Sequence, residues 1–188
     1  MNKTKRKIFE ASMKLFAEKG YDATSVEEIT ATVGVAKGTL YYHFSSKEEI
    51  FEFLIEEGVK LLKNSIDIKT ENLQNSIDKI KAIVLIQLKV LVKYEDFMTI
   101  VLSEIWGSST RSVICKKYIF EYIEMVENIV KEGIKKGEII EGDSNVIASG
   151  IFGFTSSSLI YKMRKEKEIE VPELYAEIDK TFIRKLKK

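Results

Sequence analysis

Helix-breaking residues are almost absent from this chain, which contains one proline, Pro172, in 188 residues. Proline removes a backbone donor and breaks a helix interior, so long stretches without it are free to be helical. Apolar side chains recur at spacings of three and four residues along most of the chain. The sequence therefore predicts an all-α fold of about nine helices.

The charge balance is nearly neutral, with a formal net charge of +1, so bulk charge does not indicate a partner. The basic excess gathers at the N-terminus, where Lys3, Lys5, Arg6 and Lys7 cluster. This cluster is either a solvated tail or a flexible arm that reaches DNA. The composition, with 45% hydrophobic residues, suits one or two domains with a core of their own.

The protein is expected to be soluble and cytoplasmic, with no membrane partner. Its one cysteine, Cys115, excludes an intrachain disulfide and is expected to be a small buried hydrophobe. The N-terminus is polar and lacks the apolar segment of a signal peptide. The most apolar run, Ala82–Val92, contains Gln87 and Lys89 and is too short to span a bilayer.

Two short helices are predicted around a tight turn near the N-terminus. Ser25-Val26-Glu27-Glu28 has the pattern of a capping box, which marks the start of a helix. Gly34 can supply the positive φ that the turn after this helix needs. A further helix is expected from about Ala36 to His43, with Leu40 and then Phe44 as its core positions. This order of elements is the helix-turn-helix arrangement.

The rest of the chain divides at a polar, weakly patterned stretch, 64–76. We predict a helix-turn-helix domain over 1–47, a connecting helix over 47–63 that opens with a second capping box at Ser46, and a second helical domain over 64–188. Later helices are expected near 77–93, 96–106, 112–136, 144–164 and 172–186. The last of them has an apolar seam at four-residue spacing, formed by Leu174, Ile178, Phe182 and Leu186.

The predicted second helix of the helix-turn-helix carries side chains suited to a DNA groove. Since only Leu40 is needed in the core, its neighbours are free to face outward, although Tyr41 could lie partly against the core. Glycine allows close backbone approach, threonine contacts a base edge, and tyrosine hydroxyls and lysines contact phosphates. We expect DNA contacts from Lys37, Gly38, Thr39, Tyr41, Tyr42, His43 and Lys47. A catalytic or metal-binding role for His43 lacks the partners it needs, since there is no second histidine.

The segment KGYDATSVEEITATVGVAKGTLYYHFSSKEEIF, Lys19–Phe51, resembles the DNA-binding domain of the tetracycline-repressor (TetR) family. The resemblance runs from Ile8 to Phe51 without a gap. It implies that 1–47 is a DNA-binding domain and that 64–188 is a ligand-sensing and dimerisation domain. It also implies a homodimer on a palindromic operator in double-stranded DNA, with the helices near 144–164 and 172–186 forming the dimer interface. It adds Ser25 and Ala36 to the DNA-contacting residues. Ala36 departs from the serine of many members, so a phosphate hydrogen bond is expected to be missing there.

The C-terminal half is rich in aromatic residues and methionine, which form either ordinary core or the wall of an apolar pocket. As pocket residues for a small hydrophobic or amphipathic effector we name Phe97, Leu102, Trp106, Tyr118, Tyr122 and Phe154. Glu104 is expected to face solvent, and an inward position would favour a cationic ligand. Gly150 and Gly153 indicate either a close helix contact in a dimer or room for a ligand.

The helix-turn-helix pattern predicts a DNA-binding protein, and the resemblance implies a ligand-responsive, sequence-specific repressor that a small-molecule inducer releases from DNA. The alternative is a DNA-binding regulator without a small-molecule ligand, controlled or anchored by a protein partner. No nucleophile–base pair, metal cluster or phosphate-binding loop is recognisable, so we expect no enzyme activity, catalytic residue, metal or cofactor.

Overall fold

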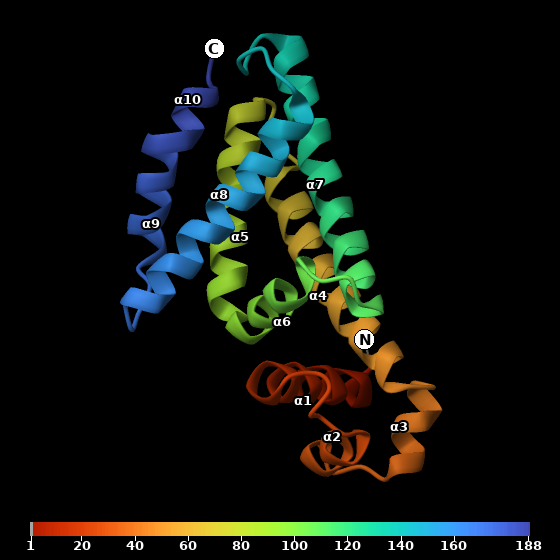
Figure 1. The fold of residues 1–188 in the computed structure, drawn as a ribbon. Helices are drawn as coiled ribbons and strands as arrows, with labels where there is room; N and C mark the ends of the chain where they lie inside the picture. Colours follow the sequence, from red (N-terminus) through yellow and green to blue (C-terminus); the bar gives the residue numbers. More distant parts are fainter. Residues whose placement is uncertain (1) are drawn as a thin grey trace. The chain divides into compact units, whose positions relative to one another are not determined.

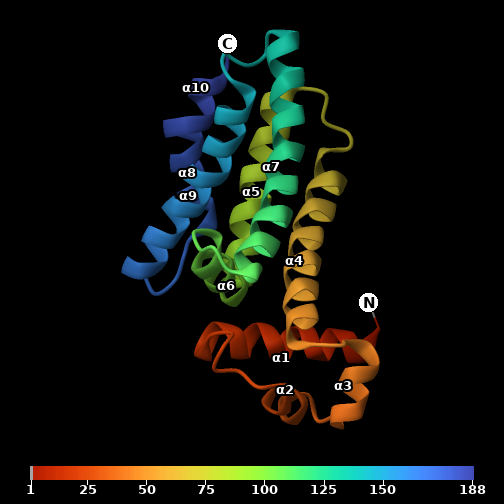
Figure 2. The same cartoon turned by 45° about the vertical axis from the view of Figure 1, so that its right-hand side comes forward.

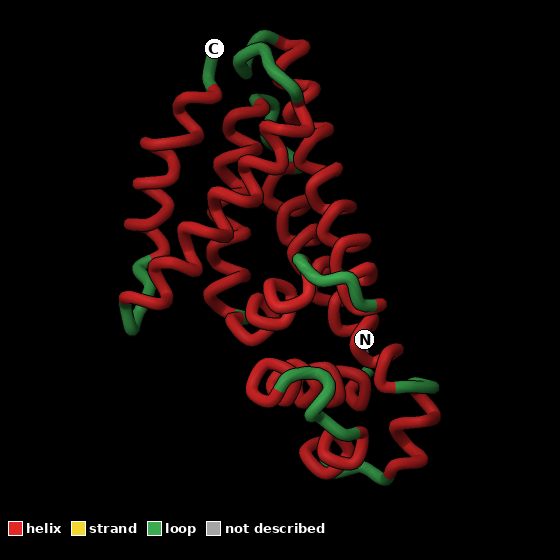
Figure 3. The backbone as a smooth tube through the Cα atoms, in the orientation of Figure 1, coloured by secondary structure: helices red, strands yellow, loops and turns green. Residues whose placement is uncertain are grey.

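The computed structural model describes residues 2–188, and most of them are helical (Figures 1 and 3). Within this range the strand-like pairing is an isolated antiparallel bridge between Ile139 and Lys187. The all-α prediction is therefore confirmed. In chain order the elements are α1 (Lys3–Lys19), α2 (Val26–Val33), α3 (Lys37–His43), α4 (Lys47–Thr70), α5 (Ser76–Lys93), α6 (Glu95–Ile105), α7 (Thr110–Lys136), α8 (Ser144–Lys165), α9 (Val171–Ile178), η1 (Asp179–Ile183) and α10 (Arg184–Leu186).

The helices form two compact units. Unit 1 contains the described residues up to Lys60 together with Tyr94–Tyr118, and unit 2 contains Leu61–Lys93 and Ile119–Lys188. In unit 1, α1 lies between α2 and α6, and α3 follows α2 (Figure 2). In unit 2, α5 packs against both α8 and α9 (Figure 1). The predicted functional division into 1–47 and 64–188 stays a prediction.

The start of α2 follows the predicted capping box. The Ser25 hydroxyl accepts from the Glu28 backbone N–H at 3.1 Å, and the Ser25 N–H donates to the Glu28 carboxylate at 2.8 Å. Gly34 ends the helix in the left-handed region, with φ 73° and ψ 39°. A side chain at that φ is strained, so glycine is the residue this turn requires.

Helix α4 begins at Lys47, as predicted, but one bond of the predicted capping box differs. Ser46 accepts from the Glu49 backbone N–H at 3.1 Å, as a cap should. The Glu49 carboxylate, however, reaches back to the N–H and hydroxyl of Ser45 instead of Ser46. The helix also continues to Thr70, beyond the predicted end at 63, because Ile66 is buried and anchors the additional turns.

The basic cluster at the N-terminus lies in the first turns of α1, so it forms neither a tail nor a flexible arm, and a contact between this cluster and DNA stays a prediction. Asn2 caps α1 by accepting from the Lys5 backbone N–H at 2.8 Å, and the helix begins at Lys3. The Lys5 ammonium lies 5.2 Å from the centre of the Phe44 ring. Capping and this cation–π contact fix the first turn in place.

The C-terminal helix contains a π-helical turn, η1, that shifts the predicted apolar seam. Leu174, Ile178 and Ile183 are buried, whereas Phe182 is only half-buried. A π turn spans one residue more than an α turn, so the core position after Ile178 falls five residues later. The prediction of Phe182 as a seam residue is therefore wrong, and Ile183 takes that place. Arg184 and Asp179 pair across the same turn at 2.8 Å.

Candidate nucleic-acid interface and ligand-sensing residues

Helix α3 presents almost all of its side chains to solvent. Leu40 and Phe44 are buried, as their spacing predicted. Tyr42 is 85% exposed and Tyr41 is 45% exposed, so Tyr41 is not a core residue. The other exposed positions on and beside this helix are Ala36, Lys37, Gly38 and Thr39, and His43 is half-buried. The nine residues predicted to contact DNA, Ser25 and Lys47 among them, all lie in unit 1 on or beside α2, α3 and the start of α4.

Lys37 is paired with Glu27 across the turn between α2 and α3. The hydrogen bond between them raises the pKa of Lys37 and lowers the pKa of Glu27, so both side chains stay charged near neutral pH. Both side chains are more than half exposed, and an exposed pair contributes little to stability. The pair therefore leaves Lys37 available to exchange Glu27 for a phosphate.

Lys47 occupies the first position of α4 and is held by the turn between α1 and α2. Its ammonium donates to the carbonyl oxygens of Tyr21 at 3.0 Å and Thr24 at 2.9 Å. It also lies 4.2 Å from the centre of the Tyr21 ring. These partners carry no net charge, so they do not neutralise the ammonium.

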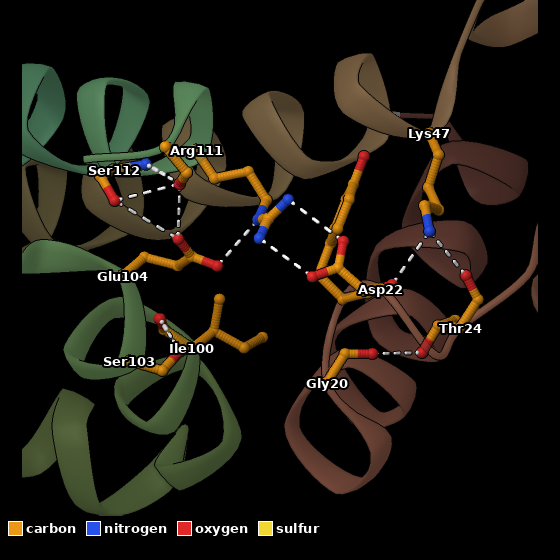
Figure 4. A network of polar contacts seen from close by, with 11 residues as sticks. Gly20, Asp22, Thr24, Lys47, Ile100, Ser103, Glu104, Arg111 and Ser112 are labelled. Atoms are coloured by element: carbon orange, nitrogen blue, oxygen red, sulfur yellow. Dashed lines mark hydrogen bonds and ion pairs between the residues drawn. The ribbon is translucent and has the colours of Figure 1, made fainter. Parts of the chain in front are cut away.

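A charged network that the sequence did not indicate joins this turn to the start of α7 (Figure 4). Arg111 donates through Nε to Glu104 at 2.8 Å, and through its two terminal nitrogens to Asp22 at 3.3 and 3.4 Å. The Glu104 carboxylate also accepts from Ser109 at 3.0 Å. Asp22 and Arg111 are 89 positions apart, so no local pattern relates them.

Glu104 is mostly buried, so the prediction that it faces solvent is wrong. Its side chain is 15% exposed. The apolar run around it gave no sign of a partner. Ser109 before α7 donates a hydrogen bond to the Glu104 carboxylate, and Arg111 in the first turn of α7 neutralises its charge. A carboxylate so satisfied can be buried at acceptable cost. Cys115 on the next turn is fully buried, and desolvation raises the pKa of its thiol to about 12.

The six residues predicted to line an effector pocket are divided between the two units. Phe97, Leu102, Trp106 and Tyr118 belong to unit 1, and Tyr122 and Phe154 belong to unit 2. Phe97, Tyr118 and Tyr122 are buried and Leu102 is half-buried, whereas Trp106 is 89% exposed and Phe154 is 38% exposed. Their role as ligand-binding residues stays a prediction.

A buried polar cluster lies in the core of unit 2. The Tyr122 hydroxyl donates to the Gln87 amide oxygen at 2.8 Å, and the Gln87 amide nitrogen donates to Ser156 at 3.0 Å. Burial raises the pKa of the Tyr122 phenol, so it stays protonated. Gln87 within an otherwise apolar run was the sequence signal for such a cluster, because a buried amide needs partners.

Unit 2 also has a surface groove of about 910 Å³ along α4, α5 and α7. Acidic side chains outnumber basic ones on its walls. They are Asp67, Glu71, Glu121 and Glu124, against Lys63 and Lys79, with Ile68, Met125 and Ile129 as apolar patches.

The described residues, 2–188, hold no group of three or more His, Cys, Asp or Glu side chains placed to bind a metal ion. Over the same residues, no helix combines the length and the apolar character needed to cross a membrane.

Residues 8–54 match the family model of bacterial regulatory proteins of the tetR family. YerO of Bacillus subtilis, an uncharacterized HTH-type transcriptional regulator, is 28% identical over 80% of this chain and 54% of its own length. IcaR of Staphylococcus aureus, a negative transcriptional regulator of a biofilm operon, is 39% identical over 39% of this chain and 40% of its own. The chain thus spans about half the length of these curated relatives or less.

A solved structure is similar over the whole chain. It is that of a proposed fatty acid metabolism regulator from Clostridium perfringens, 38% identical, with a TM-score of 0.88 over 96% of this chain and 98% of that one. The similarity therefore includes both compact units and not the helix-turn-helix alone.

Proposed function

Since this chain belongs to the tetR family of bacterial regulatory proteins, we propose that it is a ligand-responsive repressor that binds a palindromic operator as a dimer. The observation that carries the proposal is the exposed face of α3, where Thr39 and Tyr42 project from a helix held in the core by Leu40. Such a helix fits the major groove of double-stranded DNA. The protein would act in the cytoplasm, where the DNA is.

The residues of this surface have distinct roles in the proposal. Thr39 contacts base edges, and Gly38 allows the backbone to approach the DNA. Phosphate contacts come from the other positions, namely Ser25, Lys37, Tyr41, Tyr42, His43 and Lys47. Ala36 has no side-chain hydroxyl to add a phosphate hydrogen bond. Lys37 exchanges Glu27 for a phosphate as the complex forms.

Release from DNA follows from a change in the spacing of the two recognition helices. In a dimer they must lie about 34–36 Å apart to enter successive major grooves. An effector that binds a dimer of different spacing more tightly shifts the population away from DNA. It does so only by the difference between its affinities for the two forms.

We infer that the effector is a small hydrophobic or amphipathic molecule. The aromatic residues of the C-terminal half support this class, and the similar regulator from Clostridium perfringens, named for fatty acid metabolism, favours a fatty acid or its derivative. The alternative is control by a protein partner, which a contiguous exposed apolar patch would favour. Release of operator by a fatty acid in a purified system would exclude the need for such a partner.

The first experiment is selection of bound fragments from random duplex DNA, followed by titration of the enriched site at several salt concentrations. A palindromic site, with an affinity that falls steeply with salt, is the expected result. No enriched site with the purified, ligand-free protein would overturn the proposal of a sequence-specific repressor.

Variants on α3 and α4 then separate the two kinds of contact. Lys47→Met removes a phosphate contact, so it should weaken binding to all sequences and reduce the salt dependence by about one counterion. Thr39→Ala should instead change the preference among operator sequences. An equal loss on every sequence would show that Thr39 does not contact a base.

A further inference from the structure

Two cations lie over the ring of Tyr21, in the turn between α1 and α2. The Arg111 guanidinium is 4.3 Å from the ring centre, and the Lys47 ammonium is 4.2 Å from it. Tyr21 is buried, so water screens these contacts weakly, and cation–π attraction is strongest in such places. One side chain of the turn therefore contacts both the start of α4 and the start of α7.

The position of Lys47 is unfavourable unless something holds it. It lies in the first turn of α4, where the helix dipole disfavours a positive charge. The carbonyls of Tyr21 and Thr24 and the Tyr21 ring offset that cost. The conformation of the α1–α2 turn thus determines where this ammonium points.

Arg111 forms a shorter and more buried contact with one of its two carboxylate partners than with the other. Toward Glu104 the contact is 2.8 Å between side chains that are 22% and 15% exposed. Toward Asp22 the contact is 3.3 Å, and the Asp22 side chain is 83% exposed. An exposed pair is weak and is screened by salt, whereas a mostly buried pair is costly to break. Arg111 therefore stays with Glu104, and its contact with Asp22 is the one that can be released.

We propose that Arg111 is a positioning residue for operator binding. Anchored on Glu104, it fixes the α1–α2 turn through Asp22 and the Tyr21 ring, and that turn holds Lys47 ready for a phosphate (Figure 4). Loss of the Asp22 contact would therefore weaken operator binding without breaking the pair between Arg111 and Glu104. The inference rests on the proposed function, in which Lys47 contacts DNA.

The test breaks the exposed end of this bridge and leaves the buried end intact. Asp22→Asn removes the ion pair, and Glu18→Gln is its matched control. Glu18 is an exposed carboxylate on α1 whose contact with Lys14 is 3.9 Å. Both variants remove one negative charge from unit 1, so their general electrostatic gain for DNA is similar. We expect Asp22→Asn to bind the selected operator about two- to fivefold more weakly than the control, the range for one exposed pair.

A second readout separates positioning from a merely structural effect. If Asp22 acts through Lys47, then Asp22→Asn and Glu18→Gln should have equal effects in a Lys47→Met background. A structural role would instead give the same loss in both backgrounds, together with a lower melting temperature, and would overturn the inference.

Failure of the inference and failure of the proposed function look different. If the wild type binds an enriched operator, and Asp22→Asn binds it as tightly as the control does, the positioning role is wrong while the repressor proposal survives. If the wild type enriches no operator, both proposals are wrong.

Discussion

At the scale of single residues, replacing Gly38 by alanine should stabilise the fold and weaken DNA binding. It lies within α3, and a Cβ added there would meet no atom within 4 Å. Alanine is favoured over glycine in a helix, so Gly38→Ala should raise the free energy of unfolding by about 0.5–1 kcal/mol. The added methyl group would nevertheless separate the backbone from DNA and weaken operator binding. Urea unfolding and operator titration on one preparation measure both effects.

Gly58→Ala provides the contrasting control. A Cβ at this position would lie 2.3 Å from the buried Phe97 ring, so the ring or the helix must move. The free energy of unfolding should fall by about 1–3 kcal/mol. If Gly38→Ala left operator affinity unchanged, close backbone approach at Gly38 would be excluded.

Residue contacts divide into those that spacing predicts and those it cannot. The burial of Leu40 and Phe44 followed from helical periodicity, because residues four positions apart lie on the same face of a helix. The bond between Arg111 and Asp22 depends on how α7 and the α1–α2 turn meet in unit 1. No local pattern encodes that contact. The burial of Glu104 was missed for the same reason, since its partner determines it.

At the scale of helices, the capping box of α2 should make the free energy of unfolding depend on pH in the acid range. The hydrogen bond from Lys19, followed by those from Ser25, lowers the pKa of Glu28 from 4.5 to about 2. A carboxyl with a lowered pKa in the folded state stabilises the fold above pH 4.5, and this contribution is lost as the pH falls toward 2. Glu28→Gln keeps the cap but cannot titrate. The difference in unfolding free energy between wild type and variant should therefore shrink between pH 4.5 and 2.

Urea unfolding at several pH values checks this prediction. Glu10→Gln is a suitable control, because Glu10 is also exposed and paired but caps no helix. A constant difference between wild type and Glu28→Gln over that range would show that the Glu28 charge does not stabilise the fold.

Helix boundaries show what periodicity misses. The start of α2 was predicted correctly because four adjacent residues form its cap and can be recognised in the sequence. The π turn was not predicted, because one extra residue in a turn leaves the composition unchanged and alters only which apolar side chain is buried. Both Phe182 and Ile183 are apolar, so packing against α5 and α8, not sequence spacing, decides between them.

At the scale of the whole molecule, a charged residue placed on the exposed face of α8 should disrupt the proposed dimer more than one placed elsewhere on unit 2. Tyr161 is 61% exposed, and Phe154 on the same helix is partly exposed and stacked on Phe182 at 5.0 Å. A two-fold axis at α8 and α9 would bring each such residue near its copy. Tyr161→Glu should cost the isolated chain little, because the position is exposed. In the dimer it would place two like charges close together.

We therefore expect Tyr161→Glu to sediment as a monomer at micromolar concentration and to bind the operator about tenfold more weakly or worse, since the two half-sites would no longer be bound together. Ile68→Glu is the matched control, because Ile68 is an apolar residue of the same unit, 72% exposed on α4. If Ile68→Glu dissociated the dimer and Tyr161→Glu did not, the interface would lie along α4, and the assignment to α8 and α9 would be wrong. A dimer that survives both changes would also exclude Tyr161 from the interface.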